Sequence, residues 1–152
     1  MMRPPRDIES VVPHRGTLLL VDRVLDWDDE SIRTELRVRH DDPFGADEGM
    51  PAWVGLEYMA QTIAAWAGCR ARAAGRAPRI GFLLGTRRYE CAVAHFAAGS
   101  TLQLEARCEM LGDNGLGMFA CRILEAGIEI ATANLSVYEP DEASGYLESG
   151  KT

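Results

Sequence analysis

The feature that most constrains the fold is a long, mostly apolar segment at residues 50–75. Its apolar residues recur at helical spacing, Pro51 suits a first helical turn, and Gly75 is a typical C-terminal stop. About 24 residues at 1.5 Å each predict a rod of roughly 36 Å. The stripe expected to be buried comprises Trp53, Leu56, Ala60, Ile63, Ala64 and Ala67. One acid, Glu57, lies within this stripe and therefore calls for a structural or chemical reason.

Strands are predicted on both sides of this helix, from alternating polarity and from turn residues between the runs. They cover residues 17–27, 31–39, 79–93, 101–111, 116–124 and 128–138. Small residues along the helix, from Ala60 to Ala74, would let a sheet approach closely. The order predicts an α+β hotdog fold, in which a curved antiparallel sheet of about six strands wraps one long central helix. Residues 1–140 would form this single domain and residues 141–152 a polar tail.

Composition narrows the classes of partner. The chain has 152 residues and a formal net charge of −7, which disfavours nucleic acid binding. The start has no apolar signal core, and Glu57, Gln61 and Arg70 interrupt the apolar helix. We therefore expect no membrane span and a cytoplasmic location.

The cysteines indicate neither disulfides nor a metal site. Cys69, Cys91, Cys108 and Cys121 are widely spaced, without a CxxC pair, and fall inside predicted helix or strands. They are predicted to be reduced packing residues, and neither a metal nor an organic cofactor is expected.

Two segments resemble the FabZ and FabA 3-hydroxyacyl-acyl-carrier-protein dehydratases. Residues 12–24, Val-Pro-His-Arg-Gly-Thr-Leu-Leu-Leu-Val-Asp-Arg-Val, resemble the opening of the FabZ type. Residues 50–61 are similar to the family segment Pro-Gly-x-x-x-x-Glu/Asp-Ala-Met-x-Gln, with Glu57 at the acid and Ala52 in place of glycine. The resemblance covers nearly the whole chain and is closest to predicted dehydratases, some of them from aryl-polyene clusters. It implies removal of water from 3-hydroxyacyl thioesters.

That reaction needs a base for the proton beside the carbonyl and an acid for the departing hydroxyl. The resemblance assigns the acid to Glu57 and the thioester carbonyl to the helix start, near Ala52 and Trp53, where backbone N–H groups point outward. Gln61 would orient the acid or the hydroxyl.

The base is the open part of this mechanism. The position of the family histidine holds Pro43, and the nearest histidine is His40, which is our candidate base. The alternatives are His14, whose usual role in the Pro-His-Arg motif is structural, and a residue from another subunit.

Three functions remain open from the sequence. The first is a dehydratase of fatty-acid or polyketide type. The second is a thioesterase in which Glu57 activates water. The third is a non-catalytic subunit of a heteromeric dehydratase, which the proline at position 43 supports.

Expected partners follow from charge and from the predicted sheet edge. Six arginines gather after the helix: Arg70, Arg72, Arg76, Arg79, Arg87 and Arg88. They would either form a solvated face or dock an acyl carrier protein or coenzyme A phosphates. The open edge of strand 79–93 predicts a homodimer, an oligomer of dimers, or a heteromer with a homologous hotdog subunit.

Overall fold

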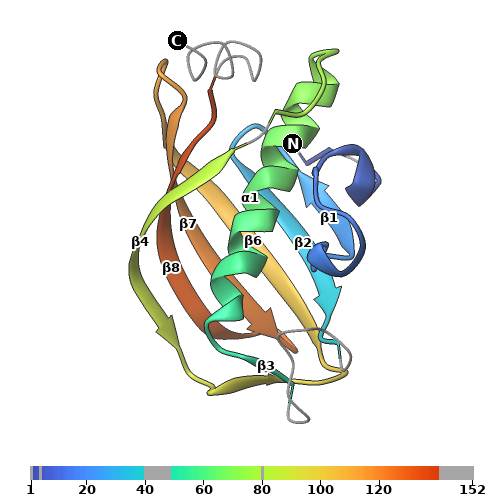
Figure 1. The fold of residues 1–152 in the computed structure, drawn as a ribbon, viewed down its shortest axis with the longest axis vertical. Coiled ribbons are helices and arrows are strands. Elements are labelled where there is room, and N and C mark those ends of the chain that lie inside the picture. Colours follow the sequence, from blue (N-terminus) through green and yellow to red (C-terminus); the bar gives the residue numbers. More distant parts are fainter. Residues whose placement is uncertain (1, 4, 40–48, 80, 141–152) are drawn as a thin grey trace.

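A curved, antiparallel six-stranded sheet holds one long helix, α1 (Val54–Ala73), against its concave face (Figure 1). The computed structural model describes residues 2–3, 5–39, 49–79 and 81–140. In sheet order the strands are β1 (Arg23–Trp27), β2 (Ser31–Arg37), β6 (Thr101–Leu111), β7 (Leu116–Glu125), β8 (Ile128–Tyr138) and β4 (Phe82–Cys91). A small second sheet pairs β3 (Gly49–Pro51) with β5 (His95–Ala97). This architecture confirms the predicted hotdog fold. The tail at residues 141–152 lies outside the described residues.

Tight turns define the three central strands, and here the sequence was most informative. β6 and β8 have the predicted limits. The β6–β7 turn closes with the Gly112 N–H donating to the Leu116 carbonyl at 2.8 Å, and Gly115 adopts a φ of 86°. The β7–β8 turn places Ala126 and Gly127 at φ values of 51° and 79°, as a two-residue hairpin loop requires. Local turn chemistry therefore fixes the register of this part of the sheet.

The helix begins later than predicted, at Val54 rather than around Pro51. Met50 and Pro51 instead pair with Phe96 and His95 in the small sheet. The Ala52 N–H extends this pairing by donating to the Ala94 carbonyl at 2.9 Å. Non-local pairing with β5 thus overrides the local helical preference. The predicted stop is confirmed, because Gly75 follows the helix with a φ of 75°.

The first strand is also shorter than predicted. A 3₁₀ turn, η2 (Gly16–Leu18), occupies the start of the expected strand 17–27, and β1 begins only at Arg23. Between them, the backbone N–H groups of Leu20 and Val21 donate to the side chain of Gln61 at 2.9 and 3.3 Å. A helix side chain therefore replaces a neighbouring strand as their partner.

The helix faces the sheet with a different side from the one predicted. The sheet-facing side is almost fully buried and consists of Val54, Tyr58, Thr62, Ala65 and Cys69. In the stripe expected to be buried, Ile63 is 4% exposed, but Trp53 is 57% exposed and Ala60, Ala64 and Ala67 are half-buried. Apolar residues surround the helix, so periodicity alone could not choose between its sides.

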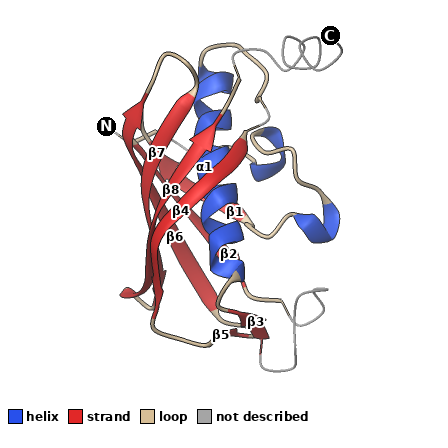
Figure 2. Ribbon diagram, turned by 60° about the vertical axis from the view of Figure 1, so that its left-hand side comes forward, coloured by secondary structure: helices blue, strands red, loops and turns tan. Residues whose placement is uncertain are grey.

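The N-terminal segment covers another part of the helix. It carries η1 (Ile8–Ser10) and η2, which lie on the side of α1 away from the sheet (Figure 2). A β-carbon on Gly68 would lie only 1.9 Å from the Val11 carbonyl oxygen. At Gly68 the close neighbour is therefore the N-terminal segment, whereas the prediction named the sheet.

All four cysteines are free, as predicted. Cys69 on α1 and Cys121 on β7 are buried, and burial raises the pKa of Cys69 to about 11 and that of Cys121 to about 12. Within the described ranges, α1 included, no helix has the length and apolar character needed to cross a membrane.

Candidate active site

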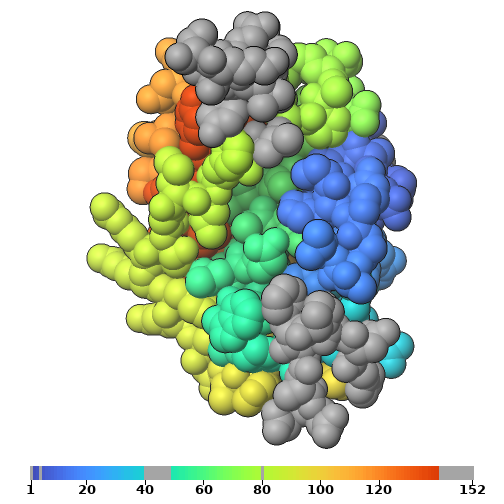
Figure 3. Space-filling view, in the orientation of Figure 1, coloured from blue at the N-terminus to red at the C-terminus, as the bar shows by residue number. Residues whose placement is uncertain are grey.

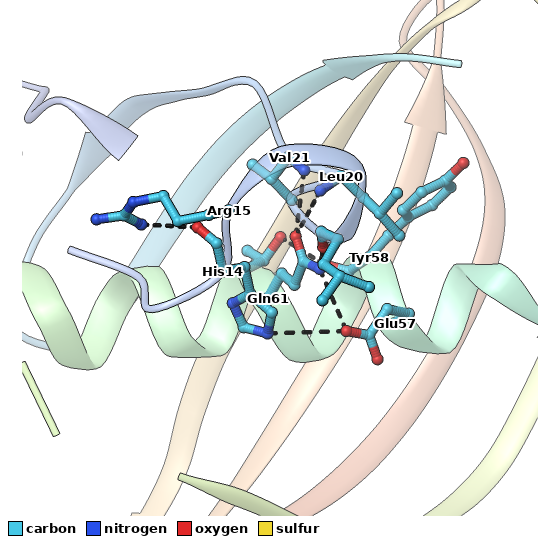
Figure 4. Close-up of polar contacts among 9 residues, drawn as sticks. His14, Arg15, Leu20, Val21, Glu57, Tyr58 and Gln61 are labelled. Atoms are coloured by element: carbon cyan, nitrogen blue, oxygen red, sulfur yellow. Dashed lines mark hydrogen bonds and ion pairs between the residues drawn. The ribbon is translucent and has the colours of Figure 1, made fainter. Parts of the chain in front are cut away.

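Glu57 and His14 converge beside the first turn of α1 (Figure 4). Glu57 projects from the helix, and His14 comes from the loop between η1 and η2. The His14 Nε2 atom lies 3.9 Å from Glu57 Oε1. Glu57 is 47% exposed and His14 29% exposed, so both remain within reach of a ligand. This exposure corrects the expectation that Glu57 is buried.

Gln61 connects Glu57 with the N-terminal segment. Its side chain is fully buried, and its Nε2 group donates to Glu57 Oε1 at 3.2 Å and to the Leu18 carbonyl at 2.7 Å. Its Oε1 atom accepts the N–H groups of Leu20 and Val21. Both amide N–H donors are therefore engaged within the protein. This geometry suits a side chain that orients Glu57 better than one that binds substrate directly.

Arg15 holds the loop that carries His14. Its guanidinium donates to the carbonyls of Val12 at 2.8 Å, His14 at 2.6 Å and Glu9 at 2.6 Å. The His14 Nδ1 atom is buried and has no hydrogen-bond partner among the described residues. A buried polar atom without a partner is uncommon in native proteins and calls for an explanation, such as a catalytic role or a bound water.

The helix start differs from the expected carbonyl site. The Ala52 N–H is engaged with Ala94, while the Ala52 carbonyl accepts the Gly55 N–H at 3.0 Å and the Tyr89 hydroxyl. Burial raises the pKa of Tyr89, which keeps this hydroxyl a donor. The Trp53 side chain is exposed at the N-cap position. Both backbone polar groups of Ala52 therefore have partners within the chain, and the helix itself begins at Val54, where the positive end of its dipole lies.

An apolar pocket of about 260 Å³ opens beside this pair. His14 and Glu57 line it together with one side of α1, including Ala60 and Ala64, and with Phe82 at the start of β4. Figure 3 shows the surface hollowed over the green helix, between the yellow-green β4 and the blue N-terminal segment. The half-buried residues Ala60, Ala64 and Ala67 thus line a space large enough for a ligand.

A larger groove of about 770 Å³ is lined by β6, β7 and β8 residues such as Glu105, Arg122 and Asn134. These alternate with the core residues of the same strands, so the groove lies on the outer face of the sheet. Arg122 pairs with Glu105 at 2.6 Å and with Glu129 at 3.7 Å. Neither His14 nor Glu57 lines it. Of these two sites among the described residues, the pocket along α1 is the one that combines an acid, a histidine and an apolar wall.

Other candidates from the sequence do not join this arrangement. His40 and Pro43 lie outside the described residues. His95 lies on β5 and does not line the pocket. In the part of the chain that the structure describes, no group of three or more His, Cys, Asp or Glu side chains is placed to hold a metal ion. The histidine that faces Glu57 was visible in the Pro-His-Arg motif, but the spacing in the sequence gave no sign of their contact.

A family model described as ApeP dehydratase matches residues 6–148. The chain belongs to the ApeP-like family of dehydratases. Its structure is similar to a chain of the dehydratase heterocomplex ApeI:P from Xenorhabdus doucetiae, with 27% identity and a TM-score of 0.86 over 97% of this chain and 99% of that one. This result supports the predicted relation to the aryl-polyene dehydratases. The ApeP-like chain is thus a dehydratase-like hotdog protein.

More distant structures share only the fold with this ApeP-like chain. A hypothetical thioesterase with coenzyme A from Streptococcus pneumoniae TIGR4 is 10% identical, with a TM-score of 0.60 over 76% of this chain and 83% of that one. The Escherichia coli PaaI protein is 13% identical, with a TM-score of 0.59 over 76% and 80%. No curated protein sequence matched the chain.

Proposed function

We propose that this ApeP-like protein removes water from 3-hydroxyacyl thioesters, with Glu57 as the acid and His14 as the base. The observation that carries the proposal is the 3.9 Å approach of His14 Nε2 to Glu57 Oε1 beside an apolar pocket. The proton removed and the hydroxyl lost are on adjacent carbons of the substrate. An acid and a base that serve both must therefore converge, as these two side chains do.

The reaction has a simple proton balance. His14 Nε2 takes the proton beside the thioester carbonyl, and the resulting enolate lies near the positive end of α1. Protonated Glu57 gives its proton to the hydroxyl, the carbon–oxygen bond breaks, and the enolate electrons form the carbon–carbon double bond. The products are water and an enoyl thioester. Transfer of the proton from His14 to Glu57 then restores both groups.

In the test, pure protein is incubated with 3-hydroxyacyl pantetheine thioesters, and the formation of enoyl product and of free thiol is measured separately. We expect enoyl product from the wild-type chain and its loss in Glu57→Gln and His14→Gln. His95→Gln is the matched histidine control. Thiol release without enoyl product would instead support the thioesterase. Full activity in His14→Gln would show that another residue is the base, and His40 would be tested first.

A second candidate is a subunit that works only within a heteromeric dehydratase. What supports it is the heterocomplex that contains the ApeI:P relative. Such a chain would be inactive alone and would become active with a homologous hotdog partner. The same assay, repeated after mixing the two subunits, separates this candidate from the first.

We also propose an acyl carrier protein as donor of the thioester and a dimer formed through β4. β4 is an edge strand, and its Phe82, Leu83 and Leu84 side chains are 39%, 45% and 58% exposed. Arg87 and Arg88 are exposed on the same strand and suit an acidic carrier. Arg70, Arg72 and Arg79 have partners within the chain, so the six arginines do not act as one patch.

A further inference from the structure

The pocket beside Glu57 follows the helix toward its C-terminal end. Ala60, Ala64 and Ala67 line it in succession. At 1.5 Å per residue, Glu57 and Ala67 are about 15 Å apart along the axis. The side chains of Phe82 and Leu83 add apolar wall from β4, which runs alongside the helix (Figure 1). The pocket is therefore an elongated slot with the reactive pair near one end.

A charged pair lines the other end of this slot. Arg79, which follows the helix, and Glu139, which follows β8, both contribute to the lining. Arg79 Nη1 lies 3.9 Å from Glu139 Oε1, and each side chain is 30% exposed. The backbone of Glu139 is anchored, because its N–H donates to the Gly115 carbonyl at 2.9 Å. The slot thus has polar groups at both ends and an apolar wall between them.

Gly115 keeps this charged end in place through its backbone. Its φ of 86° is in the region that favours glycine, and a β-carbon there would lie 2.1 Å from the Glu139 carbonyl oxygen. The turn and the strand end that carries Glu139 therefore approach as closely as a glycine permits. Glu139, which directly follows β8, is therefore held in place by the end of the sheet.

We propose that the Arg79–Glu139 pair is an end stop that limits the length of the acyl chain. This inference rests on the proposed function, because it assigns the slot to the acyl chain of the thioester. Methylene groups gain by lying along Ala60, Ala64 and Ala67. A chain end that reaches the charged pair removes water from two charges and offers them no hydrogen bond. Longer unbranched chains therefore lose affinity.

The first experiment measures binding, so it does not depend on turnover. Pantetheine thioethers with saturated chains from butyl to hexadecyl are titrated calorimetrically into the full chain. In the wild type each added methylene should strengthen binding by about fourfold until the limit is reached. Beyond that length the affinity should stop rising or fall. Equal gains up to hexadecyl would overturn the end stop.

The deciding variant replaces the pair by apolar side chains, Arg79→Met with Glu139→Leu. The first chain beyond the wild-type limit should then bind at least about tenfold more tightly. The matched control, Arg122→Met with Glu129→Leu, removes a similar ion pair from the outer groove and should leave the limit unchanged. An unchanged limit in the Arg79/Glu139 variant would overturn the proposal.

A second variant tests the slot if the double variant does not fold. Ala64→Leu should shorten the accepted chain while butyl binding persists, and an unchanged profile would count against the slot. Ligands whose alkyl chain ends in a hydroxyl test whether the Arg79–Glu139 pair excludes the chain end or instead binds a polar chain end. If they bind the wild type better than methyl-ended chains of equal length, and lose this advantage in the Arg79/Glu139 variant, the end stop is wrong.

Turnover of 3-hydroxyacyl pantetheine thioesters is measured on the same proteins. A length limit in binding that moves with the variant, without any enoyl product, supports the end stop and removes the proposed activity of the isolated chain. If enoyl product forms but the length limit is the same in the wild type and the Arg79/Glu139 variant, the activity is supported and the end stop is wrong. His14 and Glu57 are unchanged in every variant, so the two proposals fail separately.

Discussion

The two sides of α1 show how one helix can serve packing and chemistry separately. Toward the core, Tyr58 lies against Phe96 of β5 with ring centroids 5.6 Å apart, and the Thr62 hydroxyl lies 2.9 Å from that of Thr34 on β2. Away from the sheet, Glu57 faces His14, and small alanines line the pocket. Fully buried side chains thus pack toward the core, whereas half-buried alanines leave room for a ligand. Changes on the two sides should therefore affect different properties.

The largest effect is expected from Glu57→Gln on the pocket side. Loss of the acid should lower the rate of water removal by about 10²–10⁴-fold. The side chain is 47% exposed, so the free energy of unfolding should change by less than about 0.5 kcal/mol. Enoyl formation and urea unfolding test the two statements. Glu109→Gln, an exposed acid on β6, is the control and should change neither.

Tyr58→Ala, one residue further along the helix, should have the opposite profile. Removing this buried ring should lower the free energy of unfolding by about 3–5 kcal/mol. Activity per folded molecule should persist at low temperature, because the side chain does not line the pocket. Thermal unfolding followed by circular dichroism measures the loss. A stable but inactive Tyr58→Ala would contradict the division between the two sides.

Gln61→Leu should affect both properties, because this side chain connects them. The N–H groups of Leu20 and Val21 would lose their acceptor, which should cost about 1–3 kcal/mol. Glu57 would lose its donor, and we expect kcat to fall about tenfold with little change in KM. Gln61→Glu keeps an acceptor for the two N–H groups, but its second oxygen would face Glu57 Oε1 and the Leu18 carbonyl, so it should not recover the stability. If Gln61→Leu raises KM alone, Gln61 binds substrate directly.

The effect that is smallest near neutral pH concerns Cys69 and Cys121 in the core. Burial favours their neutral thiols, so the unfolded chain releases protons first as the pH rises above the ordinary thiol pKa of 9.0. The contribution of these thiols to stability should be constant below this pH and fall as the pH approaches 11, by up to about 1.4 kcal/mol per pH unit for each thiol. Urea unfolding between pH 8 and 10.5 measures the slope, and Cys69→Ala should reduce it. An identical slope in that variant would assign the change to other groups.

The sequence was most successful where local chemistry decides structure. Gly112, Gly115 and Gly127 mark hairpins whose strands have nearly the predicted limits. Gly75 marks the helix end for the same reason, since few other residues accept its backbone conformation. Prediction failed at Pro51 and at residues 17–22, where the partners come from β5 and from Gln61. Pairings between distant segments leave no local pattern.

By itself, the sequence determined the long helix, the antiparallel strands and an acid near the helix start, because periodicity and turn residues act over short distances. Only the tertiary structure decided which side of α1 faces the sheet, since apolar residues surround that helix. It also brought His14 to Glu57, through Arg15 and the bonds from Gln61 to the N-terminal segment. The meeting of an acid and a histidine depends on how distant segments pack, and no spacing along the chain records it.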